Sequence, residues 1–378
     1  MMNPYDDNED NDIEELAEDF KQAADSGAPA FFDSDDYQDI IGLFLESGEM
    51  EYAKKAIQRA IGEFPEEPYF HLQHAKYYAL MMNYNDAQRE LNYLEANYTP
   101  IPEFYIEKVL IYHAFNKKIN GIELLNKALD LDENIPEAHL LLAHEYLSED
   151  NVEKAVEHSV RAIQLDELAA EDLKIVTIDF QGFFTPNNSP LVEFYTRMTE
   201  ELPMCGSLWS GLGLVYMNRH DFDRAIEAFQ FQLSLDEDDS IAYVNLAEAQ
   251  LAAEDYQNAL HNFLIAQEKS ELLQFNVQLG RCYYYMQDYD NAMRYFLQAK
   301  QDDPLYSFVI SDIVRVFKAQ GKFDDARAYL REQLRKDPQN IEAVEELIDL
   351  LNPQKHIEEI KDLCFAALNL ENYPKYSF

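Results

Sequence analysis

The chain has 378 residues, of which 72 are acidic and 30 are basic, so its formal net charge at pH 7 is −42. Phosphate backbones and anionic lipid head groups repel such a chain, so we expect no nucleic acid and no membrane among its partners. Basic or neutral protein segments fit this charge better. The three cysteines lack C-x-x-C spacing, and neither a secretory leader nor a long apolar run is found. We therefore expect no disulfide framework, and a reducing, cytoplasmic location.

Residues 1–33 form an acidic N-terminal segment with 11 Asp and Glu residues against one Lys. We expect about the first ten residues to be disordered, because they are rich in charge and poor in apolar side chains. From Asp12, apolar side chains recur at helical spacing and predict a short amphipathic helix that ends near Gly27. They are Ile13, Leu16, Ala17, Phe20 and Ala24. Three interpretations stay open: this helix covers the end of the adjoining structure, the whole segment is disordered, or it folds back into the protein's own groove.

Residues 34–169 are predicted to form four degenerate helical hairpins of about 34 residues each. Their first helices share an aromatic side chain at the same position, namely Phe44, Tyr78, Tyr112 and Tyr146.

Residues 170–205 form the least regular unit. The run KIVTIDF is rich in β-branched side chains, and TPNNSP interrupts the expected turn. We still predict helices, because Leu173, Val176 and Phe180 keep helical spacing. Ser189 and Pro190 are suited to the start of the second helix. The extra residues in the turn predict a local bend or a protruding loop.

The most regular stretch, residues 206–239, predicts two amphipathic helices joined by a tight turn. In the first helix, Trp209, Leu212 and Tyr216 share one face, and Gly213 leaves room there for a close neighbour. In the second helix, Ala225 is small enough to let the helices touch, and Phe229 fills the space beyond it. Asp221 is a plausible N-cap of this helix.

The small residue at 225 recurs along the chain at intervals close to 34 residues. It returns as Ala53, Ala87, Gly121, Ala155, Leu191, Ala259, Ala292, Ala326 and Ile360. The order W-x2-L-G-x2-Y followed by A-x3-F resembles the tetratricopeptide repeat (TPR), a helix-turn-helix unit of about 34 residues. The resemblance covers about ten tandem repeats. It implies an all-α fold, a right-handed superhelical α-solenoid in which each repeat packs on its neighbours. The C-terminal block, residues 206–374, holds five repeats, and residues 375–378 form a tail.

The resemblance also implies a concave groove lined by the first helix of each repeat. In the N-terminal block the residues implied to face it are mostly apolar and carry little charge: Leu72, Lys76, Ile106, Leu110, Leu140 and His144. In the C-terminal block, basic side chains converge beside an apolar and aromatic floor. The candidate peptide-binding residues there are Val244, Asn245, Leu251, Val277, Arg281, Tyr284, Phe308, Arg315 and Lys318. Such a surface suits an extended peptide with an acidic side chain or a C-terminal carboxylate.

In an alternative interpretation, these basic side chains stabilise the contacts between repeats and bind no ligand. Glu248 and Asp349 occupy the same column in flanking repeats, so Glu248–Arg281 and Arg315–Asp349 are possible inter-repeat ion pairs. Some TPR domains bind the C-terminal carboxylate of chaperones, and the resemblance does not extend to that function. The lysine that should accompany Asn245 is replaced by Ser210 in one repeat and by Val244 in the next.

No phosphate loop, dinucleotide fingerprint, zincin motif or nucleophile elbow occurs in the sequence. We therefore expect no enzyme and no cofactor. His113 and His144 are predicted to face the same side of neighbouring repeats, but a third ligand is missing, so we expect no metal site.

The sequence thus predicts a non-catalytic scaffold or adaptor that binds peptide segments or a partner helix in its groove. The alternative is a self-inhibited regulatory subunit whose acidic N-terminal segment occupies the groove until a partner displaces it. An unrecognised enzyme is the third class. At the C-terminal end, Leu363, Ala366 and Leu370 widen an apolar stripe, which predicts weak homodimerisation unless the neighbouring charges solvate it.

Overall fold

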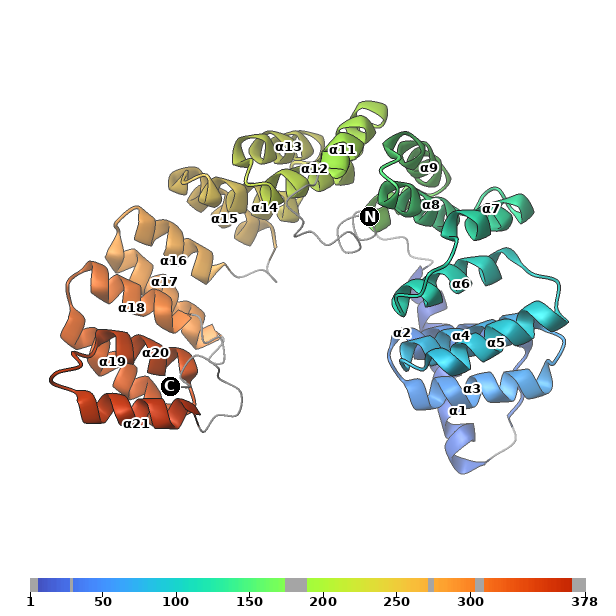
Figure 1. Ribbon diagram of the computed structural model, residues 1–378, viewed down its shortest axis with the longest axis horizontal. Coiled ribbons are helices and arrows are strands. Elements are labelled where there is room, and N and C mark those ends of the chain that lie inside the picture. Colours follow the sequence, from blue (N-terminus) through green and yellow to red (C-terminus); the bar gives the residue numbers. More distant parts are fainter. Residues whose placement is uncertain (1–5, 28–29, 174–188, 271–274, 303–308, 369–378) are drawn as a thin grey trace. The chain divides into compact units, whose positions relative to one another are not determined.

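The computed structural model describes residues 6–27, 30–173, 189–270, 275–302 and 309–368, and within this part of the chain it contains helices, turns and loops but no strand (Figure 1). The chain divides into two compact units, the N-terminal unit (residues 1–181) and the C-terminal unit (residues 182–378). The all-α prediction is confirmed for the described residues. The dividing point falls within the irregular stretch 170–205, of which residues 174–188 lie outside the described part, and with them Val176, Phe180 and residues 185–188 of the TPNNSP run. Ser189 and Pro190 begin a helix (Ser189–Glu201), as their sequence predicted.

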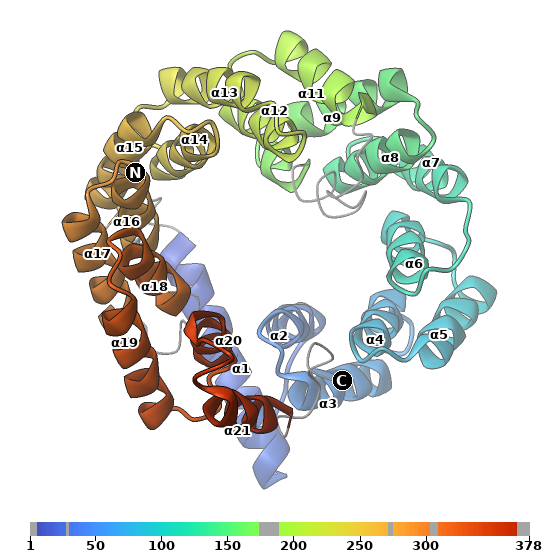
Figure 2. The same cartoon turned by 60° about the vertical axis from the view of Figure 1, so that its left-hand side comes forward.

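In each unit, helices pair into hairpins that stack on the next hairpin (Figure 2). The N-terminal unit contains α1 (Asp6–Ser26), α2 (Ser34–Glu46), α3 (Met50–Glu63), α4 (Pro68–Leu80), α5 (Tyr84–Asn97), α6 (Pro102–Ala114), α7 (Gly121–Leu131), α8 (Pro136–Ser148) and α9 (Val152–Leu165). The C-terminal unit contains α11 (Ser189–Glu201), α12 (Gly206–Asn218), α13 (Phe222–Leu235), α14 (Ser240–Ala252), α15 (Tyr256–Lys269), α16 (Asn276–Tyr285), α17 (Tyr289–Asp302), α18 (Val309–Ala319), α19 (Phe323–Lys336), α20 (Ile341–Leu350) and α21 (Ile357–Leu368).

One turn geometry recurs in the hairpins. The turn residue before the second helix has a positive φ, and the backbone N–H that follows it donates to the carbonyl five residues earlier, closing the first helix as a Schellman motif does. In four consecutive turns these acceptor carbonyls belong to the periodic aromatics Phe44, Tyr78, Tyr112 and Tyr146, at 2.8 to 2.9 Å. The left-handed residues are Gly48, Met82, Asn116, Asp150, His220, Glu254, Gln287 and Gly321. The 34-residue period of the sequence is therefore also a period of the backbone.

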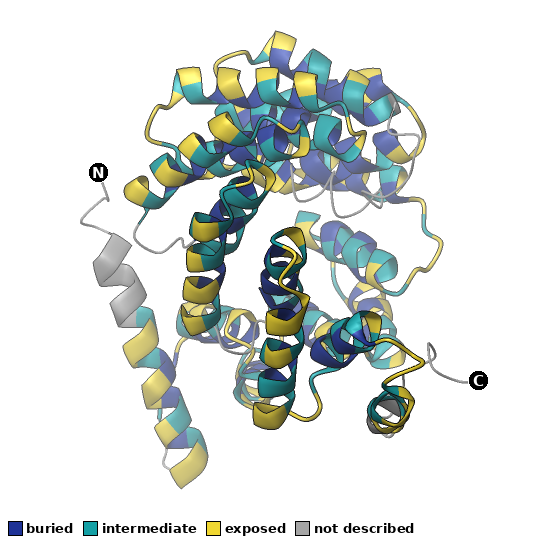
Figure 3. Ribbon diagram, turned by 90° about the vertical axis from the view of Figure 1, so that its left-hand side faces the viewer, coloured by how far each residue is buried: buried dark blue, intermediate teal, exposed yellow. Residues whose placement is uncertain are grey.

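Small residues let the two helices of a hairpin approach each other. A Cβ atom added to Gly213 of α12 would overlap the ring of Phe229 on α13, and one added to Gly280 of α16 would overlap Phe296 on α17. Phe229 and Ala225 are fully buried, as their spacing predicted. Many helices carry buried residues on one side and exposed residues on the other (Figure 3).

α1 packs on the first hairpin, against α2 and to a lesser extent α3. Its Phe20 is 1% exposed, and its ring lies 5.6 to 6.2 Å from those of Phe32, Tyr37 and Phe44. At the helix edge, Lys21 pairs with Glu49 at 2.9 Å. α1 thus takes the place that the second helix of a preceding repeat would occupy. It begins at Asp6, earlier than the Asp12 start expected from the sequence, so residues 6–10 are helical where disorder was expected.

Candidate functional site

The candidate peptide-binding residues of the C-terminal unit lie on first helices. Val244, Asn245 and Leu251 belong to α14, Val277, Arg281 and Tyr284 to α16, and Arg315 and Lys318 to α18; all eight are partly or fully exposed. Phe308 lies outside the described residues. α16 and α18 pack against each other, which brings Arg281, Tyr284 and Arg315 together. On the α14 side, the pKa of Glu248 is raised by burial and lowered in part by a hydrogen bond to Gln278 and by the charge of Arg281.

The two arginines share one buried carboxylate that the sequence reasoning missed. Asp312 of α18 is 4% exposed. Its Oδ2 accepts from Arg281 Nε at 3.1 Å and lies 3.0 Å from Nη2, while its Oδ1 accepts from Arg315 Nη1 at 3.2 Å. The ion-pair interpretation named Glu248 and Asp349 as partners, whereas the structure gives Asp312. The three-residue spacing of Asp312 and Arg315 on one helix is the signal that could have found it.

Aromatic side chains hold Arg315 from the other side. Its guanidinium carbon lies 5.2 Å from the ring centroid of Tyr284, and Nη2 donates to the hydroxyl of Tyr285 at 3.4 Å. The Tyr285 hydrogen bond raises the pKa of the guanidinium. Lys318 is paired separately, with Glu346 of α20 at 2.6 Å. The side chains of Arg281 and Arg315 remain 39% and 43% exposed, so both keep a solvent-facing surface.

A hollow lies in the N-terminal unit, beside α6 and α8. It has a volume of about 560 Å³. It is lined by Leu110, Ile135, Pro136, Glu137, Leu140, Leu141, Asp166, Ala169 and Asp172. Of the residues implied to face a groove here, Leu110 and Leu140 line this hollow, while Leu72 and Ile106 are buried in the core.

Carboxylates make this surface more acidic than its sequence suggested. Burial raises the pKa of Glu107 on α6, and Lys76 of α4 offsets this shift in part from 3.5 Å. Burial also raises the pKa of Glu137, and the charge of Glu107 adds to that shift. The expectation of little charge in this block was therefore wrong. It considered only one column of side chains per helix and left out the carboxylates at Glu107, Glu137 and Asp172.

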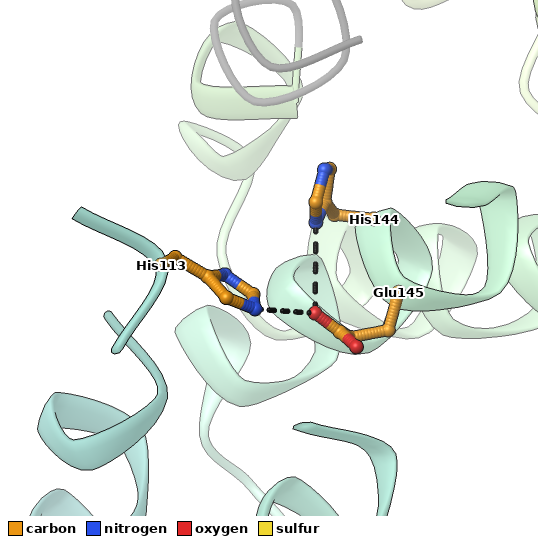
Figure 4. Close-up of side chains that lie close together, drawn as sticks. All are labelled: His113, His144 and Glu145. Atoms are coloured by element: carbon orange, nitrogen blue, oxygen red, sulfur yellow. Dashed lines mark ion pairs between the residues drawn. The ribbon is translucent and has the colours of Figure 1, made fainter. Parts of the chain in front are cut away.

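A third feature of the N-terminal unit is a cluster of His113, His144 and Glu145 (Figure 4). The missing third donor of the histidine pair is thus supplied by Glu145, which follows His144 directly. Burial lowers the pKa of His144 to about 4, so its imidazole is neutral at pH 7.

Models of the tetratricopeptide repeat match residues 136–167, 210–271 and 273–303. The chain contains tetratricopeptide repeats. The matched stretches span α8 and α9 in the N-terminal unit and α12 to α17 in the C-terminal unit, which confirms the resemblance drawn from the residues. Tetratricopeptide repeats are in general protein-interaction modules without catalysis, so a protein-interaction scaffold is supported.

Solved structures of other repeat proteins are similar at low sequence identity. A chain of the APC/C hetero-tetramer Cut9–Hcn1 has 17% identity and a TM-score of 0.37 over 84% of this chain and 56% of that chain. Yeast Tom70 has 13% identity and a TM-score of 0.38, over 96% and 93%. The C-terminal part of a TPR repeat-containing protein from Cytophaga hutchinsonii has 14% identity and a TM-score of 0.43, over 72% and 98%. TM-scores this low add nothing to the family assignment.

The sequence matches no curated protein. Among the described residues, no helix combines the length and the apolar character that crossing a membrane requires.

Proposed function

We propose that this chain is a non-catalytic scaffold whose first-helix surfaces bind segments of other proteins. The observation that carries the proposal is the hollow beside α6 and α8, where apolar walls meet the exposed carboxylates of Glu137, Asp166 and Asp172. Burial and, after it, the charges of Glu107 and Asp172 raise the pKa of Glu137, and carboxyl groups perturbed in this way concentrate at functional sites.

The chemistry of this hollow fits a partner segment with apolar and basic side chains. Leu110 offers an apolar contact, with Leu140 and Leu141 largely buried behind it, and Glu137 and Asp172 lie beside them as acceptors for lysine or arginine. A basic segment would neutralise the carboxylates, and the net charge of −42 would attract it over a longer range.

The C-terminal candidate residues are a second binding surface, for an acidic side chain or a C-terminal carboxylate. Asp312 fixes the guanidinium groups of Arg281 and Arg315 in place, and both remain partly exposed. Each guanidinium carries five N–H donors, so a ligand carboxylate could bind without displacing Asp312.

Selection from a random-peptide display library tests both surfaces without knowledge of the natural partner. For the N-terminal surface we expect enriched peptides rich in lysine, arginine and leucine. Their affinity should fall at least tenfold in Glu137→Gln/Asp172→Asn and stay unchanged in Glu167→Gln, which removes an exposed charge outside the hollow. Loss of binding in the control variant as well would show that the peptides respond to the net negative charge of the chain and not to this hollow.

For the C-terminal surface, we expect peptides with acidic C-termini that lose binding in Arg315→Gln/Lys318→Gln. These changes leave Arg281 in place as a partner for the buried Asp312. Arg335→Gln, on the outer helix α19 with a side chain 74% exposed, is the matched control. A selection that enriches no peptide above background would contradict the scaffold proposal.

The position of α1 bears on the self-inhibited alternative. Its apolar face is occupied by the first hairpin, so a capping role is better supported than occupation of a groove. Affinities for the selected peptides should therefore be equal in the full chain and in a variant without residues 1–30, measured at a temperature where both are folded. A clear rise in affinity on deletion would favour self-inhibition.

We further propose that the chain forms a weak homodimer through exposed apolar side chains of α21. Ile357 and Phe365 of α21 are 55% and 65% exposed, although Ile360 and Leu363 pack on the core. The side chains of Ala366 and Leu370 lie outside the described part. Sedimentation velocity should show concentration-dependent association that Phe365→Glu abolishes; a monomer at all concentrations would refute it.

A further inference from the structure

The cluster of His113, His144 and Glu145 is assembled from two successive hairpins of the N-terminal unit. His113 lies in the last turn of α6, and the other two residues lie on α8. The three side chains are largely shielded, with exposures of 16%, 5% and 17%. Neither the hollow beside α6 and α8 nor the C-terminal arginines include these residues, so the cluster is independent of the proposed peptide-binding surfaces.

Gly121 leaves room for the carboxylate of Glu145 where it lies. A Cβ atom at this first residue of α7 would fall 2.6 Å from Cδ of Glu145, so the carboxylate occupies space that only glycine leaves open. The N-terminus of a helix also favours a negative charge. Three helices, α6, α7 and α8, therefore hold the donor atoms together.

The donor atoms are nearly at the separations of a zinc site. Glu145 Oε1 lies 3.0 Å from His113 Nε2 and 3.9 Å from His144 Nδ1, and all three ligand atoms lie within 4.8 Å of one another (Figure 4). Zinc–ligand bonds of about 2.0–2.2 Å in a tetrahedron put donor atoms roughly 3.3 Å apart. Small side-chain rotations would bring the three atoms to that separation.

We propose that His113, His144 and Glu145 bind one Zn²⁺ through Nε2, Nδ1 and a carboxylate oxygen. Two imidazoles and one carboxylate suit Zn²⁺, whereas Ca²⁺ and Mg²⁺ prefer oxygen donors alone. Three protein ligands leave the fourth position of the tetrahedron to water. Because the donors come from α6 and α8, the ion would tie two neighbouring repeats together.

Metal binding to the metal-free full-length chain is the test. One equivalent of Zn²⁺ should bind in competition with a chromophoric chelator, and excess Ca²⁺ should not displace it. Co²⁺ in the same site should give the intense visible absorption of tetrahedral coordination, whereas Co²⁺ on scattered surface carboxylates gives the weak absorption of octahedral coordination.

Variants then assign the ligands. His113→Gln and Glu145→Gln should each weaken Zn²⁺ binding at least tenfold, and His261→Gln, an exposed histidine of α15, should leave it unchanged. Circular dichroism without metal shows whether each variant is folded. Only the folded wild type and the control should gain thermal stability when Zn²⁺ is added.

Two results would overturn the assignment. The first is an octahedral Co²⁺ spectrum or displacement of Zn²⁺ by Ca²⁺ in the wild type, which requires no variant to fold. The second is Zn²⁺ affinity in folded His113→Gln and Glu145→Gln equal to that of the wild type. Either would leave the His113–Glu145 contact as an inter-repeat ion pair only.

Discussion

Several carboxylates in this chain are held where their charge is unfavourable, and Glu137 illustrates the consequence. Its side chain reaches solvent but lies among protein atoms near the charge of Glu107, and burial first and that neighbour second raise its pKa above 4.5. A carboxyl with a raised pKa in the folded state binds its proton more tightly there than in the unfolded chain. Its contribution to stability is therefore complete below pH 4.5 and is lost as the pH rises through the folded-state pKa.

We predict that Glu137→Gln stabilises the protein at pH 7 by only a few tenths of a kcal/mol, because it removes a charge that lies near other carboxylates but that solvent screens. The gain should shrink as the pH is lowered toward 4.5, where the wild-type carboxyl takes up its proton. Urea denaturation between pH 4.5 and pH 7 measures this difference, with Glu167→Gln as the control. A variant less stable than the wild type at pH 7 would show that the carboxylate is stabilising.

Close packing gives a second prediction at this scale. Gly213→Ala should destabilise the chain by about 1–3 kcal/mol, because its methyl group meets the buried ring of Phe229. Gly42→Ala, in the middle of α2 with open space around it, should stabilise by roughly 0.5–1 kcal/mol through helix propensity. Thermal unfolding of both variants checks the pair. Equal shifts of the unfolding temperature in the two variants would mean that helix propensity alone determines their stability.

The sequence predicted core residues better than site residues. Ala225, Phe229 and Gly213 follow from helical spacing, because their places are set by the repeat itself, although Phe229 also lies in one buried cluster with Leu246 and Ala249 of the next hairpin. Asp312 and Glu145 were missed, because their roles depend on how one hairpin is rotated against the next. In a chain with 72 acids a carboxylate by itself carries little signal, and for Asp312 only its three-residue spacing to Arg315 could have been recognised.

At the scale of elements, the repeat period predicted hairpins and their turns together. Proline at the first helical position opens α4, α6 and α8, at Pro68, Pro102 and Pro136. Side-chain caps at residues such as Asn83, Asn151 and Asp255 start the second helices. The left-handed turn residues were not predicted, because most of them are not glycine.

These non-glycine turn residues store strain. Met82 has φ of 55° and a side chain 73% exposed, so glycine there would lose little packing and would relieve the left-handed conformation. We predict that Met82→Gly raises stability by about 1 kcal/mol, whereas Met82→Ala leaves it nearly unchanged. Denaturant midpoints of the three proteins measure this. A destabilised Met82→Gly would mean that unfolded-state entropy outweighs the strain.

α1 acts as an element by closing the end of the first hairpin. Phe20→Ala should cost about 3–5 kcal/mol of local stability, because it empties a site between three buried rings. Hydrogen exchange should accelerate in α1, α2 and α3 while the C-terminal unit stays protected. Unchanged exchange in α2 and α3 would show that α1 is dispensable for the stack.

At the scale of the whole molecule, charge sets the balance. Even if every basic side chain paired with one acid, 42 acids would remain without a partner. Self-repulsion of this kind opposes the compact state, and it acts over distances that salt controls. Local ion pairs such as Lys318–Glu346 stabilise the folded chain, and salt weakens this stabilisation by screening.

The salt dependence of stability is set by the larger of two effects, the repulsion among excess acids or the attraction within ion pairs. Surface ion pairs contribute about 0–1 kcal/mol each, whereas repulsion among the excess acids adds over the whole chain. The screening length falls from roughly 30 Å at 0.01 M salt to roughly 10 Å at 0.1 M, so the long-range repulsion weakens first. We therefore predict that NaCl raises the unfolding temperature by several degrees over this range. KCl should act equally if screening is the cause. A falling unfolding temperature would mean that ion pairs between repeats, rather than their packing alone, hold the stack together.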